Sequence, residues 1–123
     1  MSLEKNKALF RKVNEGINKK NLTVLDKFMA PNYVDHTNQY HSREDVRQFY
    51  TRVFKDFPDF HRTIEDIIAE DDKVWVCFKT TGTAPSGKTM NLTTVGIFRI
   101  ADGKIAEGWG IPKVVGELYE KLL

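Results

Sequence analysis

The stretch FPDFHRTIEDIIAEDDKVWV, residues 57–76, contains the change from helix to strand that decides the fold. Apolar residues recur at helical spacing up to its first residue, and Pro58 then ends that pattern. From that point the period is extended, and the sequence EDDK at 70–73 is typical of a turn. Strands are therefore predicted near 60–70 and 73–83.

Two further strands are predicted C-terminal to this stretch, near 89–100 and 104–112. APSGK at 84–88 makes a short connection from the strand near 73–83 to the strand near 89–100. Asp102-Gly103, a pair typical of tight hairpins, separates the last two strands. Because short connections join antiparallel neighbours, the four strands are expected to form a meander.

Three helices are predicted N-terminal to the same stretch. Apolar residues form one stripe along the first, over 3–17. Asn21 can cap a short second helix, which Pro31 ends. Ser42 begins the third helix and, with Asp45, resembles a capping box.

Helices followed by a run of strands predict an α+β fold. We expect the three N-terminal helices to pack on one face of a curved, mostly antiparallel sheet. A short helix is also predicted in VVGELYEKLL, residues 114–123. With 123 residues and no linker-like run, the chain is expected to form a single domain over 1–123.

The strand from residue 73 is apolar on both of its faces. Val74 and Val76 alternate with Trp75 and Cys77, so neither parity is polar. A sheet with one face in water should alternate cleanly. We therefore expect a second copy of the chain to cover the outer face, giving a homodimer. The predicted interface residues are Trp75, Val95, Ile97 and Trp109.

The charge pattern and the cysteine content narrow the class of partner. Nineteen basic and seventeen acidic residues are interspersed along the chain, which argues against nucleic acid as a partner. No apolar run is long enough for a membrane span, and the N-terminus lacks a signal-peptide core, so no membrane partner is expected. Cys77 is the single cysteine, which favours a cytoplasmic location.

The segment PNYVDHTNQYH, residues 31–41, gathers the most chemically capable side chains. Asp35 and His36 could be an acid/base pair, two metal ligands or the polar residues of a turn. Neighbours in an extended chain point to opposite faces, so only one of the two can readily look into a pocket. His41 could join a metal site, but the spacing matches no known signature, and no metal is predicted.

Three strings resemble a known family: NYVDH at 32–36, the opening stretch at 57–76, and GIFRIADGKIAEGW at 96–109. They resemble the SnoaL-like polyketide cyclases and ester cyclases, within the cone-shaped fold shared by nuclear transport factor two and ketosteroid isomerase. The resemblance implies an internal cavity for a small apolar or aromatic molecule and dimerisation through the sheet. It also implies an intramolecular aldol ring closure without a cofactor, assisted by an acid on the last strand.

The chain departs from the family at the acidic positions. The last-strand acid would fall at Gly110, and a second acid on the preceding strand would fall at Gly96. The connection at 81–90 is also shorter than the family's usual loop. His36 or Asp35 would then have to replace the missing acid. Both are candidate catalytic residues, and His36 is the leading one.

Three functional hypotheses follow. The first is a cofactor-free enzyme of cyclase or isomerase type, acting in an apolar cone. The second is a non-catalytic dimeric protein that binds a small ligand and has lost the acid, and the third is a protein-interaction module. Aromatic stripes that face the cone could contact a ligand or could be plain core. The candidate ligand-binding residues are Tyr33, Phe49, Tyr50, Phe54, Thr94, Phe98 and Gly110.

Overall fold

A computed structural model describes residues 2–111 of the chain. The helix predicted at 114–123 lies outside the described residues. Five strands form one sheet in the order β1-β5-β4-β3-β2. The elements are α1 (Leu3–Asn18), α2 (Thr23–Phe28), β1 (Met29–Asp35), α3 (Arg43–Asp56), β2 (His61–Glu70), β3 (Lys73–Thr83), β4 (Thr89–Ala101) and β5 (Lys104–Ile111).

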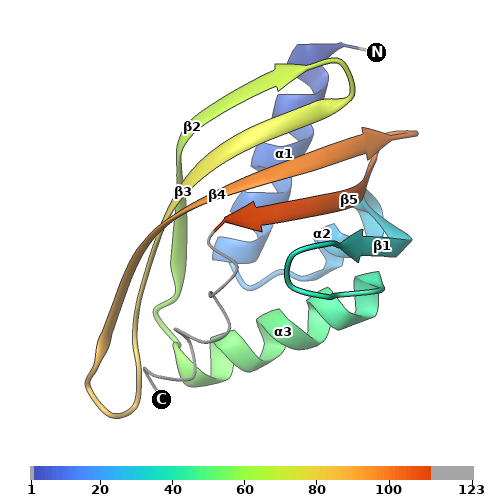
Figure 1. Ribbon diagram of the computed structural model, residues 1–123. Helices are drawn as coiled ribbons and strands as arrows, with labels where there is room; N and C mark the ends of the chain where they lie inside the picture. Colours follow the sequence, from blue (N-terminus) through green and yellow to red (C-terminus); the bar gives the residue numbers. More distant parts are fainter. Residues whose placement is uncertain (1, 112–123) are drawn as a thin grey trace.

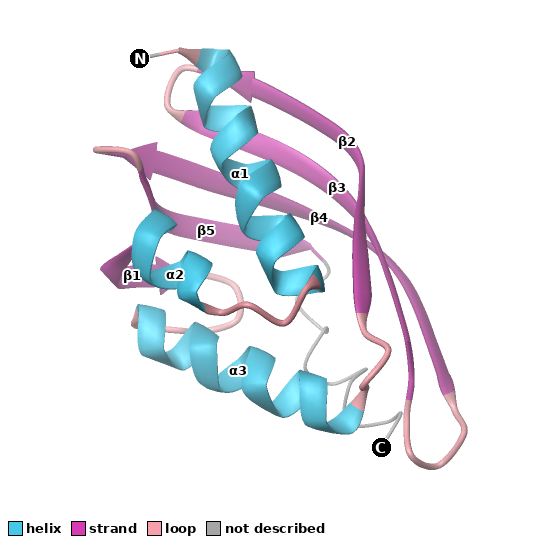
Figure 2. Cartoon of the chain, turned by 180° about the vertical axis from the view of Figure 1, so that it is seen from behind, coloured by secondary structure: helices cyan, strands magenta, loops and turns pink. Residues whose placement is uncertain are grey.

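The three helices cover one face of a strongly curved, unclosed sheet (Figures 1 and 2). Strands β3 and β4 bend together and end in a hairpin that reaches past α3 (Figure 1). The predicted α+β class, with three helices on a cone-like sheet, is therefore confirmed. Within the described residues, no helix is both long and apolar enough to span a membrane.

The helix starts follow from their capping side chains. The Oγ of Ser2 accepts from the backbone N–H of Lys5 at 3.3 Å, and the Oγ of Ser42 accepts from that of Asp45 at 3.1 Å. The carboxylate of Asp45 accepts from the backbone N–H of His41 at 2.9 Å and not from that of Ser42. The shorter aspartate thus completes a variant of the predicted capping box, shifted by one residue.

The predicted hairpins are present, and their turns have the backbone geometry that their residues favour. Asp102 and Gly103 both have positive φ, 53° and 73°, as a two-residue hairpin turn requires. Strands β2, β3, β4 and β5 pair antiparallel in sequence order. The meander expected from the short connections is therefore confirmed.

Strand β1 was not predicted. The second helix is expected to continue up to Pro31, whereas Met29–Asp35 forms a strand that pairs in parallel with β5. The sheet is therefore mixed. Pro31 is compatible with this strand because β1 lies at the sheet edge and its pairing with β5 is irregular between Met29 and Val34.

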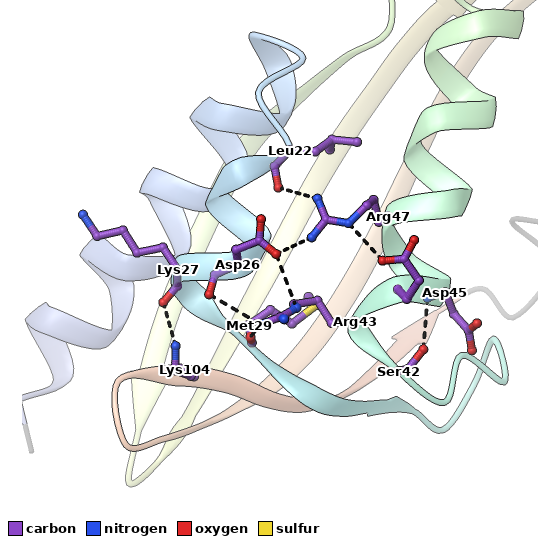
Figure 3. A network of polar contacts seen from close by, with 10 residues as sticks. Leu22, Asp26, Lys27, Met29, Ser42, Arg43, Asp45, Arg47 and Lys104 are labelled. Atoms are coloured by element: carbon purple, nitrogen blue, oxygen red, sulfur yellow. Dashed lines mark hydrogen bonds and ion pairs between the residues drawn. The ribbon is translucent and has the colours of Figure 1, made fainter.

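A network of charged side chains ties α2 to α3 and to the start of β1 (Figure 3). Asp26 of α2 forms ion pairs with Arg43 and Arg47 of α3. Arg47 also donates to the carbonyl of Leu22 at 3.3 Å, and Arg43 donates to that of Met29 at 3.3 Å. These contacts fix where β1 leaves α2, and so they position the residues at its other end.

The two faces of the sheet differ in burial. Val74 and Val76 of β3 point toward the helices and are fully buried, whereas Trp75 between them is 45% exposed. Ile68 on β2 and Val95 on β4 are also exposed, at 59% and 36%. The single chain thus leaves apolar side chains uncovered on the outer face.

Candidate functional site

A pocket of about 160 Å³ lies between the helices and the concave face of the sheet. Its wall is mostly apolar and includes side chains from α1, α3 and all five strands. Six of the seven predicted ligand-binding residues line it: Tyr33, Phe49, Tyr50, Thr94, Phe98 and Gly110. Phe54 does not, and its ring packs instead against Tyr50 and Phe60, with centroids 6.1 and 6.0 Å away.

Asp35 lines this pocket and is 8% exposed. Its Oδ1 accepts from the backbone N–H groups of Thr37 at 3.0 Å and Asn38 at 2.7 Å, which turns the chain sharply after β1. The hydroxyl of Tyr33 donates to its Oδ2 at 3.4 Å, a long hydrogen bond. The carboxyl is therefore held through one oxygen, while the other has only a weak partner.

His36 directly follows β1 and is not among the residues that line the pocket. Its Nε2 is 2.7 Å from the Oε2 of Glu107, and its ring stacks on Trp109 with centroids 5.0 Å apart. Arg99 also donates to Glu107, and this bond, followed by the one to His36, lowers the pKa of that carboxyl. The structure thus separates Asp35 from His36, and a catalytic role for either one stays a prediction.

Two tyrosines beside Asp35 are held in the protonated form. Burial raises the pKa of Tyr33, and the nearby charge of Asp35 raises it further. Burial also raises the pKa of Tyr40, with smaller contributions from Tyr50 and Asp35. Both phenols line the pocket, and because the Tyr33 hydroxyl donates to Asp35, Tyr40 is the one that can donate a hydrogen bond to a ligand.

Sequence reasoning missed Arg62, which also lines the pocket. Its Nε donates to the side-chain oxygen of Asn14 at 2.7 Å, and its Nη1 donates to the hydroxyl of Tyr50 at 2.7 Å. The guanidinium lies over the ring of Phe78, 4.2 Å from the centroid. The signal in the sequence is parity, since Arg62 shares the inward side of its extended segment with the buried Phe60.

Three glycines of β4 and β5 have different surroundings, and two of them, Gly96 and Gly110, are at the positions where the resemblance implies acids. A Cβ at Gly96 would lie 2.5 Å from the ring of Phe98, so that ring occupies the space of a side chain there. A Cβ at Gly108 would lie 2.4 Å from the Tyr33 hydroxyl oxygen and 2.9 Å from Phe98. At Gly110 the nearest atom would be the Asn38 side-chain nitrogen, 3.4 Å away, so this position has room.

Two residues predicted for the outer face also contribute to the pocket. Val95 and Trp109 are among its lining residues. Trp109 nevertheless pairs with Ile97, and Ile97 pairs with Trp75, so these three residues are aligned across the sheet.

Within residues 2–111, no group of three or more His, Cys, Asp or Glu side chains could hold a metal ion.

Comparison with protein-family models gives one description for almost the whole chain. Residues 7–119 match the model for SnoaL-like polyketide cyclase. The chain belongs to the SnoaL-like polyketide cyclase family. Sequence comparison with curated proteins finds no match.

Several solved structures share the fold of this chain. IdmH from Streptomyces antibioticus, a proposed polyketide cyclase, is 25% identical with a TM-score of 0.77, over 86% of this chain and 90% of its own. TsrD from Streptomyces laurentii is 21% identical with a TM-score of 0.84, over 99% and 97%. AclR from Streptomyces galilaeus, a proposed hydroxylase, is 24% identical with a TM-score of 0.79, over 97% and 87%. The latter two likenesses show the fold alone.

Proposed function

We propose that this SnoaL-like protein catalyses proton transfer on a small carbonyl compound, leading to aldol-type ring closure or isomerisation without a cofactor. Asp35 is the proposed base. The observation that carries this proposal is that Asp35 is the only carboxyl-bearing residue lining the pocket within residues 2–111. The family's usual acidic positions are glycine, so this carboxyl is the candidate left inside the pocket wall.

The proposed reaction uses the two oxygens of Asp35 differently. Two backbone N–H groups hold Oδ1, which orients the carboxyl. Oδ2 takes a proton from the carbon beside the substrate carbonyl: the C–H bond breaks, an O–H bond forms on Asp35, and the electron pair moves to the carbonyl oxygen. Tyr40 donates a hydrogen bond to that enolate oxygen.

The enolate then has two outcomes. In ring closure its carbon attacks a second carbonyl of the same molecule, a C–C bond forms, and the new alkoxide takes the proton back from Asp35. In isomerisation the proton returns to a different carbon. Both routes regenerate the carboxylate and need no other reactant.

The size of the pocket limits the substrate. An engineered cavity of about 150 Å³ in a protein core is enough to admit benzene. The pocket of about 160 Å³ is therefore matched to a molecule with one or two rings. We propose a small aromatic or alicyclic ketone as the substrate class.

The test compares D35N with H36A. The readout is exchange of the α-hydrogens of 2-tetralone and acetylacetone in D₂O, followed by NMR. The wild-type protein should accelerate exchange over buffer, and D35N should lose on the order of 10²- to 10⁴-fold, the usual contribution of a positioned base. H36A should remain near the wild-type rate, since His36 does not line the pocket.

The matched control is E107Q, which makes the same carboxyl-to-amide change outside the pocket lining, on β5. It should leave exchange unchanged. If D35N exchanges as fast as wild type, or if H36A abolishes exchange, Asp35 is not the base. Thermal unfolding of each variant establishes that the fold is kept.

A second candidate function is ligand binding without catalysis. It is favoured by one observation, the ring of Phe98 over Gly96, which fills one of the two acidic positions with an apolar group. In this case 2-tetralone would bind but its α-hydrogens would not exchange faster than in buffer. Binding without exchange in the wild-type protein therefore selects this second function.

The homodimer also remains a proposal. A second copy would cover the outer sheet face, where Trp75, Val95, Ile97 and Trp109 are aligned. It is supported by the exposure of Trp75 and Val95, at 45% and 36%, in the single chain.

A cytoplasmic location, expected from the single cysteine, stays a prediction as well.

A further inference from the structure

Arg62 is a cation in an apolar wall, and in the part of the chain that the structure describes no carboxylate forms an ion pair with it. Within residues 2–111, it is the only cationic residue that lines the pocket, and no carboxylate oxygen lies within ion-pair distance of it. Arg43, Arg47, Arg52 and Arg99 all have such a partner. A half-buried charge without a counter-charge is unfavourable unless something else compensates it.

The neighbours of Arg62 orient its guanidinium but do not neutralise it. Asn14 and Tyr50 each accept one hydrogen bond, and both are neutral. The ring of Phe78 offers a cation–π contact on one face of the guanidinium plane. Because a guanidinium has five N–H groups, three of them have no acceptor within the described residues.

The backbone of Arg62 is also fixed. Its N–H donates to the side chain of Asn18 at 2.8 Å, and its carbonyl accepts from the side chains of Asn14 and Asn18, each at 2.8 Å. Two asparagines of α1 thus hold this residue on the first strand of the meander. A side chain fixed at both its backbone and its head group loses little freedom when a ligand arrives, which favours tight binding.

We infer that Arg62 is an anion-binding residue of the pocket and that the ligand is a small carboxylate-bearing carbonyl compound. The carboxylate would accept from the free N–H groups of Arg62, which present two adjacent donors in the geometry that a carboxylate matches. The reacting part of the ligand would then lie toward Asp35. This inference names the substrate class of the proposed function and rests on it for the location of the site.

The test measures binding without turnover, using benzoate and benzamide as probes. The two are nearly the same shape and differ in charge. Isothermal titration calorimetry of the wild-type protein at pH 7.5 should give at least a tenfold preference for benzoate. This follows because a hydrogen bond to a charged group contributes about 1.5–3 kcal/mol, and 1.4 kcal/mol is a factor of ten.

Three variants separate the charge of Arg62 from its structural contacts. R62Q should bind both probes equally, whereas R62K, which keeps the charge, should retain part of the preference. R11Q removes a positive charge from an exposed site on α1, outside this pocket, and should keep the full preference. If R62Q does not fold, the wild-type ratio and R62K still decide the matter.

Equal binding of the two probes by the wild-type protein overturns the inference, and so does binding of neither. A benzoate preference that survives in R62Q also overturns it. The exchange assay on D35N is independent of these results, because no turnover is measured here. Failure of the proposed catalysis would therefore leave the anion preference standing, and loss of that preference would leave the role of Asp35 open.

Discussion

The substitution Gly96→Ala tests whether Phe98 has taken the space of the missing acid. A Cβ at this position would lie 2.5 Å from Cε2 of Phe98 and 2.8 Å from its Cζ. The ring cannot simply retreat, because it also packs against the buried ring of Phe10 with centroids 4.6 Å apart. Added atoms in a packed site typically cost about 1–3 kcal/mol.

A smaller opposing effect comes from the unfolded state. Replacing glycine with alanine restricts the unfolded chain and stabilises the fold by about 0.4–1 kcal/mol where the new side chain fits. Gly110→Ala isolates this effect, since its Cβ would meet only the Asn38 side chain at 3.4 Å. We therefore expect G96A to lower the free energy of unfolding by about 1–2 kcal/mol and G110A to leave it unchanged or raise it.

The assay is urea unfolding followed by circular dichroism and tryptophan fluorescence. The double variant G96A/F98L should be less destabilised than the sum of the two single variants, because the smaller side chain removes the clash. A coupling of about 1 kcal/mol is within the range seen for residues in contact. If G96A is as stable as G110A, or if the two substitutions simply add, Phe98 does not fill the space at residue 96.

Two further predictions concern the tyrosines and the outer face. In an alkaline titration followed by absorbance, Tyr33 and Tyr40 should ionise only as the protein unfolds, and Y33F and Y40F should each remove one late-ionising group. Because the raised pKa means that the folded state holds these protons more tightly, stability should fall as the pH rises above about 10, and a normal titration of both phenols would contradict this. Sedimentation at micromolar concentration should show a dimer for the wild-type protein and a monomer for W75E, and a wild-type monomer would exclude the proposed interface.

The elements that were predicted from the sequence are those with local signals. Ser42 and Pro58 mark the two ends of the third helix to within a few residues. Asp102 and Gly103 favour the positive φ angles of a two-residue turn, and so they predict the hairpin between β4 and β5. Strand β1 has no such signal, since it pairs in parallel with β5, far away in sequence, and contains Pro31. Its pairing depends on tertiary contacts, including the ion pairs of α2 with α3, which no local pattern reveals.

The candidate site was predictable in part for the same reason. Alternation indicated that only one of Asp35 and His36 could look into a pocket, and Asp35 is the residue that lines it. Which of the two would face inward could not be derived, because the strand that sets the parity was itself missed. Arg62 was overlooked because a cation on an extended segment is normally solvated, and its burial depends on Asn14 and Tyr50 from two different helices.

The parallel pairing of β1 with β5 places a glycine of the last strand beside the candidate base. Asp35 is in register with Gly108, two residues before Gly110, the position at which the resemblance to the family implies an acid. Glycine at 108 leaves room for the Tyr33 hydroxyl, which a Cβ would approach to 2.4 Å, and that hydroxyl contacts Asp35. A larger residue on β5 would therefore displace the pair on β1. The glycines of β5 and the polar residues of β1 are thus coupled by space, and a side chain at residue 108 would be expected to disturb the proposed base on β1 without touching it directly.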